Sequence, residues 1–353
     1  MESMIEVKGL KKYFKEVKAV DDVSFAVEPG ELFGFLGVNG AGKSTTVNML
    51  CTLFMPTAGE VRICGYRLGK EDENIRKSIG VVWQHNCLDG KLTVKENLLV
   101  RGSLYGYTEK ELRERVEGVC RRLFLEKIYN RRYAKLSGGQ KRLCELGAAL
   151  IHTPRILFLD EPTTGLDPAT RKLVWESLES LRQEAGMTIF LTTHYMEEAA
   201  RAGHIVILDN GKIREFGTPF ELKEKYARDK LRLWPKPGEY QQTKKVLGEM
   251  LAGKALAGDG LSAEGLGEML AGKGMWEETP AAGSQSGGLC GADGGLHRED
   301  GPLTVNLKDS MAALPLLDRL ADCISGFELV QGSMDDVFLN VTGKRLNVAD
   351  MGV

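Results

Sequence analysis

The sequence lacks the features that would place it in a membrane, in a secretory pathway or on nucleic acid. No window comes near the roughly 18 uninterrupted apolar residues of a membrane-spanning helix. The first residues, MESMIEVKGLKKYF, carry charges and no apolar run, so we expect no signal peptide. The formal net charge is −2, and this balance gives no support for a nucleic-acid partner.

Paired cysteines are also missing. The chain has 7 cysteines, all single, and no CxxC motif. An odd, unpatterned set is typical of reduced thiols in a cytosolic protein and argues against a disulfide framework or a zinc site. The chain is 42% hydrophobic and 27% charged, which indicates a globular protein with a substantial core. Its 353 residues favour two domains.

The pattern of residues 1–225 predicts an α/β domain. Alternating apolar residues before residue 28 predict half-buried strands, and an apolar run at 32–37 leads through glycines into a helical pattern at 43–54. Strand, glycine loop and helix begin a parallel α/β unit. The later part predicts a charged helical insertion at about 95–150. It also predicts strands at 155–161, 187–194 and 204–209, with a helix at 171–186.

The pattern of residues 226–353 predicts a small α+β domain with a glycine-rich insert. Residues 248–301 hold 15 of the 42 glycines, and LGEMLAGK at 247–254 recurs at 266–273. Two copies are too few for a solenoid, so we interpret them as a local duplication in a flexible insert at about 253–300. A docking role for this insert is a minority hypothesis. After residue 301 the order strand, helix, strand, helix returns.

A phosphate-binding loop stands between the first strand and helix of the α/β unit. GVNGAGKST, residues 37–45, matches the pattern GxxxxGK[ST] in the context that the motif requires. Its glycines let backbone N–H groups converge on phosphate oxygens, and the helix N-terminus adds partial positive charge. Lys43 can reach the terminal phosphates, and the Ser44 hydroxyl can bind Mg²⁺. The loop predicts nucleotide binding but no particular activity.

Three polar side chains follow the buried strands of the same sheet. Asp160 and Glu161 end the run ILFLDE, at the sheet edge where ligands bind. The first carboxylate can hold Mg²⁺ through a water, and the second can orient or deprotonate an attacking water. His194 ends the next strand and can donate a hydrogen bond to a phosphate.

The pentapeptide LSGGQ, residues 136–140, predicts a second anion site. Ser137 can cap the following helix, and Gly138 and Gly139 expose backbone N–H groups. The first loop already surrounds one side of its own phosphates. We therefore expect this second site to bind a nucleotide that another subunit holds.

GVNGAGKST, LSGGQ, LFLDEP, GLD and TTH, in this order, resemble the nucleotide-binding domain of an ABC ATPase over about residues 4–220. The resemblance implies a P-loop NTPase fold with a RecA-like parallel sheet core, an antiparallel β subdomain and a helical subdomain. It also implies ATP and Mg²⁺ as ligands. Two domains meet head to tail in this family, so that LSGGQ completes the active site of its neighbour.

The resemblance assigns roles to matching positions. Glu161 corresponds to the catalytic carboxylate, His194 to the γ-phosphate switch and Gln84 to the glutamine that senses Mg²⁺ and faces the membrane partner. With Lys43, these are the implied catalytic residues. The implied magnesium ligands are Ser44, Gln84 and Asp160. The implied nucleotide-binding residues are Tyr13 (stacked on adenine), Gly37, Asn39, Gly40, Ala41, Gly42, Lys43, Ser44, Thr45, Ser137, Gly138, Gly139, Gln140 and Asp167.

The C-terminal GSMDDVFLNVTGK resembles the end of ATPases that power drug-resistance exporters of the daunorubicin type. This second resemblance implies a homodimer on the cytoplasmic side of the cell membrane, peripheral to a separate integral membrane permease. It implies no nucleic-acid partner and no site for the transported substrate on this chain. Val38, Ala148 and the pair at 203–204 depart from common family residues, but none belongs to the hydrolysis chemistry.

Other functions stay open beside the exporter. A soluble ABC ATPase is disfavoured, because translation-factor members carry two such domains and DNA-repair members insert a long coiled coil that this sequence lacks. A regulatory module without turnover would be expected to lack Glu161 or His194, and both are present. An importer stays open as an alternative to the exporter, since nothing in the ATPase core fixes the direction of transport.

Overall fold

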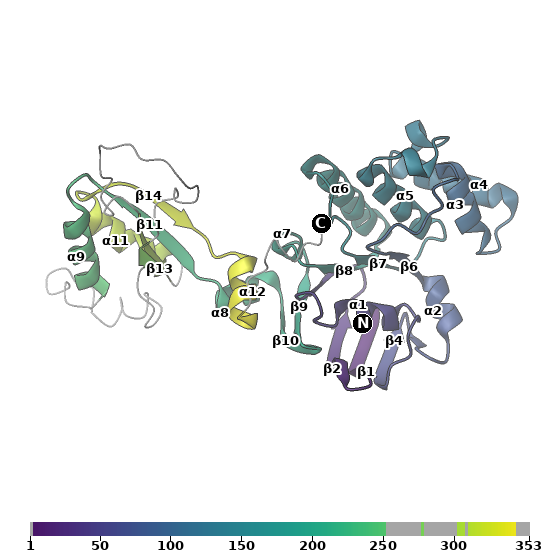
Figure 1. Cartoon of the computed structure of the whole chain (residues 1–353), viewed down its shortest axis with the longest axis horizontal. Helices are drawn as coiled ribbons and strands as arrows, with labels where there is room; N and C mark the ends of the chain where they lie inside the picture. Colours follow the sequence, from purple (N-terminus) through teal and green to yellow (C-terminus); the bar gives the residue numbers. More distant parts are fainter. Residues whose placement is uncertain (1–2, 252–276, 279–301, 308–309, 344–353) are drawn as a thin grey trace, which may run out of the picture. The chain divides into compact units, whose positions relative to one another are not determined.

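A computed structural model describes residues 3–251, 277–278, 302–307 and 310–343 (Figure 1). Two compact units are present: the first comprises Met1–Leu222 and Val341–Val353, and the second comprises Lys223–Asn340. Each is described by itself. Among the described residues, no helix combines the length and the apolar character needed to cross a bilayer.

A six-stranded sheet forms the centre of the first unit, in the order β10-β9-β3-β8-β7-β6. All neighbouring pairs are parallel except β10 with β9. The predicted runs of continuous apolar residues are buried along their whole length in β3, β7 and β8, which confirms a sheet covered on both faces. The strands are β3 (Leu32–Leu36), β6 (Ile79–Val82), β7 (Ile156–Asp160), β8 (Thr188–Thr193), β9 (His204–Asp209) and β10 (Lys212–Gly217).

A second, antiparallel sheet lies beneath the first in Figure 1 and has the order β2-β1-β4-β5. Its strands are β1 (Ile5–Phe14), β2 (Val17–Val27), β4 (Ala58–Ile63) and β5 (Tyr66–Arg67). The core between the sheets contains packed phenylalanines, with ring centroids 5.4 Å apart for Phe25 and Phe33 and 5.3 Å for Phe158 and Phe190. Burying each such ring stabilises the fold by about 2–3 kcal/mol.

The predicted helical insertion consists of α3, α4 and α5, which lie together beyond β6 in Figure 1. Thr93, Thr108 and Ser137 begin these helices with capping boxes, in which a Glu or Gln three residues later reaches back to the cap N–H. The helices of this unit are α1 (Lys43–Leu50), α2 (Asp72–Ser78), α3 (Val94–Ser103), α4 (Glu109–Arg122), α5 (Gly138–Leu150), α6 (Pro168–Ala185), α7 (Met196–Ala199) and α8 (Pro219–Tyr226), with 3₁₀ turns η1 (Glu126–Ile128) and η2 (Tyr133–Lys135).

The second unit is a four-stranded antiparallel sheet, in the order β12-β13-β11-β14, with helices packed on it. The predicted order strand, helix, strand, helix after residue 301 is confirmed by β13, α11, β14 and α12. The elements are β11 (Asp229–Pro235), α9 (Tyr240–Leu251), β12 (Glu277–Glu278), β13 (Leu303–Leu307), η3 (Ser310–Ala312), α11 (Ala313–Leu320), β14 (Ile324–Val330) and α12 (Met334–Thr342).

The first copy of the duplicated octapeptide belongs partly to the core of the second unit. Leu247 and Met250, on α9, are 1% and 2% exposed and pack with β11 and α11 residues. This part of the duplication is therefore structural. The second copy, at 266–273, and the predicted flexible insert at 253–300 lie outside the described residues except for β12.

Candidate functional site

The phosphate loop connects β3 to α1, as the sequence predicts. Gly42 precedes α1 with φ 106°, and a Cβ there would lie 2.3 Å from the Ala19 carbonyl oxygen, so only glycine fits. Asn39, Gly40 and Ser44 lie exposed, on the loop and at the start of α1. The loop therefore presents backbone and hydroxyl groups to solvent at a helix N-terminus, the arrangement that binds phosphate.

Lys43 lies inside the loop. Its side chain is buried, and Nζ donates to the carbonyl oxygens of Gly37 at 2.7 Å and Val38 at 3.3 Å. Burial lowers the pKa of Lys43, and the nearby carboxylates of Glu161 and Asp160 oppose that shift. The loop thus holds an ammonium group close to Asp160 and Glu161, the two acidic residues at the carboxyl end of β7.

Asp160 is the last residue of β7 and is buried. Thr192, on the neighbouring strand β8, donates its hydroxyl to Oδ1 of Asp160 at 2.5 Å. Burial raises the pKa of Asp160, although the Thr192 hydrogen bond and the charges of Lys43 and Arg142 oppose it. The carboxylate is therefore fixed in orientation at the carboxyl edge of the sheet.

Glu161 joins three side chains at this edge. Oε2 accepts from Gln84 Nε2 at 3.1 Å and from the Thr164 hydroxyl at 3.3 Å, while Oε1 lies 3.1 Å from His194 Nδ1. Its backbone has φ 48°, a strained value for a residue with a side chain. Burial alone would raise the pKa of Glu161, but His194 and Lys43 more than offset it, so the pKa lies below its ordinary value. Glu161 is consequently ionised at neutral pH.

His194 has one nitrogen in use and one without a partner. Nδ1 faces Glu161, whereas Nε2 is buried and has no hydrogen-bond partner among the described residues. Buried polar atoms of this kind are rare in folded proteins. A phosphate oxygen is an acceptor that would satisfy the Nε2 atom.

The LSGGQ segment forms the start of α5, as predicted. Ser137 Oγ accepts from the Gln140 N–H at 3.3 Å, and Gln140 Oε1 accepts from the Ser137 N–H at 3.2 Å. A Cβ on Gly139 would lie 2.0 Å from Thr170 Cγ2, so this glycine is required by close packing on α6. A Cβ on Gly138 would meet only Leu166 Cδ2, at 4.0 Å. Packing within this chain therefore does not require glycine at 138.

Asp167 lies beside the same segment. It caps α6, because Oδ1 accepts from the Thr170 N–H at 3.0 Å and Oδ2 from the Thr170 hydroxyl at 2.6 Å. Hydrogen bonds from Thr170 lower the pKa of Asp167. Thr170 thus contacts both Asp167, which is predicted to lie at the dimer interface, and Gly139 of LSGGQ. The two predicted features therefore lie side by side within one chain.

The predicted site residues fall into two groups and one separate side chain. The first group is Lys43, Gln84, Asp160, Glu161 and His194. The second is the start of α5 with Asp167. Tyr13 stands apart on β1, where its hydroxyl donates to Asp21 Oδ1 at 2.6 Å and Lys18 Nζ lies 5.5 Å from the ring centroid. Its ring is half-buried.

Sequence reasoning missed two buried charges on α5, Arg142 and Glu145. Arg142 donates to the backbone carbonyls of Trp83 at 2.5 Å, Pro162 at 2.6 Å and Asp160 at 3.1 Å. Trp83 directly precedes Gln84, and Asp160 and Pro162 are the two neighbours of Glu161.

Glu145 binds the far side of the same loop. It accepts from the N–H groups of Cys87 at 2.8 Å and Leu88 at 3.0 Å and from the Tyr133 hydroxyl at 2.7 Å. The signal available in the sequence was a pair of opposite charges three residues apart within the mostly apolar run of α5. The helix that begins with LSGGQ is thus bonded to both loops that carry Gln84 and Glu161.

Comparisons with known proteins decide the family. Residues 20–164 match the model of the ABC transporter family. The daunorubicin/doxorubicin resistance ATP-binding protein DrrA of Streptomyces peucetius is 34% identical over 345 residues, 96% of this chain and 92% of that protein. The chain belongs to the ABC transporter ATP-binding family. As in other members of this family, the fold is a P-loop NTPase domain, here followed by a small α+β unit.

Two further relatives agree with this assignment. The Nod factor export ATP-binding protein I of Rhizobium sp. (strain N33) is 44% identical over 223 residues, 63% of this chain and 73% of that protein. Among solved structures, the dimeric post-hydrolysis state of the ATP-binding cassette MJ0796 bound to ADP and Pi aligns with a TM-score of 0.56 and 29% identity. That alignment covers 61% of this chain and 99% of the cassette. The relationship to the drug-resistance protein, unlike these two, extends through both units.

Proposed function

We propose that this chain is the ATP-hydrolysing subunit of an exporter and drives a separate membrane permease by ATP-dependent closure of a homodimer. One observation carries the proposal: Gln84, Glu161 and His194 are hydrogen-bonded together at the sheet edge that also holds Lys43. The names of the drug-resistance and Nod factor export relatives support an exporter rather than an importer.

The phosphate loop holds the nucleotide in this proposal. Lys43 binds the terminal phosphates together with the backbone N–H groups of 37–45. Tyr13 stacks on adenine; Lys18, which lies over its ring, would have to move aside.

The donor atoms at the sheet edge fit Mg²⁺, since Ser44, Gln84 and Asp160 all offer oxygen ligands and the Ser44 hydroxyl is exposed on the first turn of α1. When bound, the ion would neutralise charge that develops on the phosphates.

Glu161 acts as the general base. Its lowered pKa keeps it ionised, and Gln84 and His194 hold its two oxygens in fixed directions. It takes the proton from the attacking water. His194 binds a γ-phosphate oxygen through Nε2, the atom that lacks a partner in this chain. Nδ1 of His194 contacts Glu161, so binding of a phosphate at Nε2 is coupled to Glu161 through the same imidazole ring.

The start of α5 completes the site of a neighbouring copy. Ser137, Gly138, Gly139 and Gln140 bind the phosphates of the nucleotide that the neighbour holds, and Asp167 lies at the shared interface. The open space around Gly138 supports this assignment, because a glycine that its own chain does not require is explained by a ligand approaching from outside. The dimeric cassette with ADP and Pi is a further support.

Two variants test the composite site by complementation. Lys43→Ala removes the phosphate-loop ammonium, and Gly138→Asp places a carboxylate where the neighbour's phosphates bind, with room for it in its own chain. Each variant alone has both sites damaged and should hydrolyse ATP slowly. A mixed dimer has one intact site, formed by the phosphate loop of the Gly138→Asp copy and the α5 of the Lys43→Ala copy. Mixing should therefore restore turnover. No recovery in the mixture contradicts the composite site.

Light scattering of Glu161→Gln tests closure directly. We expect a dimer with ATP and a monomer without it, because slow hydrolysis retains the nucleotide between the subunits. A monomer at saturating ATP contradicts closure by these two subunits alone. The dimer, peripheral on the cytoplasmic face of the membrane, should then copurify with an integral membrane permease. Variants of this chain should change the rate of export but not its substrate, since this proposal places no substrate site here.

A further inference from the structure

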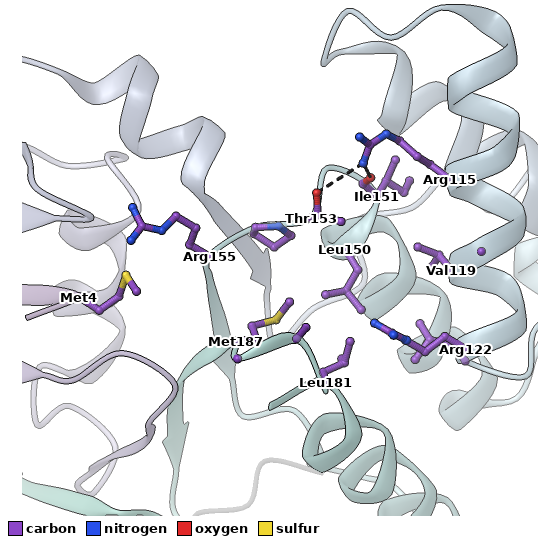
Figure 2. Close-up of a pocket in the computed structure, with 15 residues that line it drawn as sticks. Met4, Arg115, Val119, Arg122, Leu150, Ile151, Thr153, Arg155, Leu181 and Met187 are labelled. Atoms are coloured by element: carbon purple, nitrogen blue, oxygen red, sulfur yellow. Dashed lines mark hydrogen bonds between the residues drawn. The ribbon is translucent and has the colours of Figure 1, made fainter. Parts of the chain in front are cut away.

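A cavity of about 650 Å³ lies in the first unit, on the side of the sheet opposite to the nucleotide (Figure 2). Arg155 and Met187, which line it, directly precede β7 and β8. Glu161 and His194 directly follow the same two strands. Because β7 and β8 are parallel, the cavity and the catalytic group are at opposite edges of the sheet. The size is that of a pocket for a drug-sized molecule.

The cavity has an apolar wall on each side. Figure 2 shows Val119, from α4, across from Leu150, at the end of α5, and Leu181, from α6. Leu150 and Leu181 are buried core residues, so this wall is rigid. It would contact the hydrocarbon or aromatic part of a ligand.

The charged groups that line the cavity have one sign. Of its 15 lining residues three are arginines, Arg115, Arg122 and Arg155, and none is acidic. Among the described residues, the hydrogen bonds of the Arg115 side chain are long, 3.4 Å to Ile151 O and to Thr153 Oγ1, and its guanidinium lies 4.2 Å from the centroid of the Tyr107 ring. Arg122 bonds Glu184 at 3.1 Å in an exposed pair, which is weak. A ligand anion could therefore compete for these guanidinium groups.

Gly118 keeps the cavity open. It lies in the interior of α4, where glycine destabilises a helix relative to alanine. A Cβ there would meet no atom within 4 Å, so neither close packing nor the backbone requires glycine. Gly118 itself lines the cavity, and we expect a larger side chain there to enter that space.

We propose that this cavity binds a small amphipathic anion. The apolar body lies against Val119, Leu150 and Leu181, and the anionic group, a carboxylate, sulfonate or phosphate, lies on Arg122, whose side chain reaches toward Leu150 and Leu181 in Figure 2. Such a ligand would bridge α4 and the end of α5 to α6 and β8, and so join the helical insertion to the central sheet at the edge away from ATP.

Paired fluorescent probes test the proposal. 1-Anilinonaphthalene-8-sulfonate has an aromatic body with an anionic group, and N-phenyl-1-naphthylamine is the same body without it. We expect the sulfonate to bind one site on the full chain, about tenfold more tightly than the neutral probe. Arg122→Gln should weaken the sulfonate several-fold and leave the neutral probe unchanged. Equal affinity of the two probes, or no effect of Arg122→Gln, overturns the anionic part.

Gly118→Phe fills the cavity and should abolish binding of both probes, whereas Gly118→Ala should retain it. Gly248→Phe is the matched control, since Gly248 is also a helical glycine, on α9, with no atom within 4 Å of its Cβ position. Circular dichroism and thermal unfolding verify that each variant is folded. Binding to Gly118→Phe that equals binding to the unmodified chain, with Gly118→Phe folded, overturns the site.

Discussion

Two groups of polar residues lie beside the end of β7, and they differ in how completely they are hydrogen-bonded. In the α5 group, Arg142 and Glu145 each make three hydrogen bonds, and neither has an atom left buried without a partner among the described residues. In the catalytic group, His194 Nε2 has none and Glu161 is held in a strained backbone.

The difference separates a structural role from a catalytic one. A buried network whose groups are all satisfied rigidifies the fold, and breaking one member leaves the others unpaired at a high free-energy cost. A group with an unused donor and a strained backbone contributes less to stability and is prepared for a ligand. Substitutions in the α5 group should therefore act first on stability, and substitutions in the catalytic group first on turnover.

The largest effect is expected for Glu161→Gln. Loss of the general base should lower ATP turnover by about 10²- to 10³-fold, while the free energy of unfolding changes by less than about 1 kcal/mol. Phosphate release and urea unfolding measure the two quantities. Glu176→Gln, an exposed carboxylate on α6, is the control and should change neither. A large loss of stability with normal turnover would reverse the roles assigned to the two groups.

Glu145→Ala should act in the opposite way. It leaves the part-buried N–H groups of Cys87 and Leu88 and the buried Tyr133 hydroxyl without an acceptor, which should lower the free energy of unfolding by about 3 kcal/mol. Urea denaturation gives the value, and Glu117→Ala, an exposed residue on α4, is the control. A loss below about 1 kcal/mol would mean that water replaces the carboxylate and that the network is not essential.

The sequence predicts the catalytic group better than the α5 group for a physical reason. The roles of Lys43 and Glu161 depend on local geometry, a loop at a helix N-terminus and a strand end, which short motifs specify. The partners of Arg142 and Glu145 are 12 to 59 residues away along the chain, so no local pattern indicates them. Hydrophobic patterns predicted β7 as a continuous apolar run and β13 as an alternating one, because burial repeats along each strand, whereas β6, β11 and α9 were not predicted.

His194→Ala is expected to have an intermediate effect on turnover and to change its pH dependence. The variant should lower turnover by about tenfold or more. It also removes the interaction that opposes burial of Glu161, so the pKa of Glu161 should rise. Because the base must be ionised, the acid limb of kcat/KM should move to higher pH.

Stability of His194→Ala should change little, since Nε2 makes no hydrogen bond with the described residues. A pH–rate profile beside urea unfolding measures both effects. An acid limb that stays in place would show that His194 does not set the ionisation of Glu161.

Tyr133→Phe is the smallest and most selective change. Burial, then the hydrogen bond to Glu145, raises the pKa of Tyr133 well above its usual range, so the hydroxyl keeps its proton and donates it at 2.7 Å. Removing the hydroxyl should cost about 1 kcal/mol of unfolding free energy. Turnover should stay within about twofold, because the N–H groups of Cys87 and Leu88 still hold Glu145.

Tyr13→Phe is the matched comparison for that variant. Its hydroxyl also donates to a carboxylate, Asp21, but on the half-buried surface of β1, where water can replace the lost donor. It should therefore destabilise the chain less than Tyr133→Phe does. If Tyr133→Phe instead costs as much as Glu145→Ala, the tyrosine alone holds the carboxylate in place. The hydrogen bonds of Glu145 with Cys87 and Leu88 would then contribute little to holding the Glu145 carboxylate in place. Arg142 alone would then hold α5 to the loop that carries Gln84.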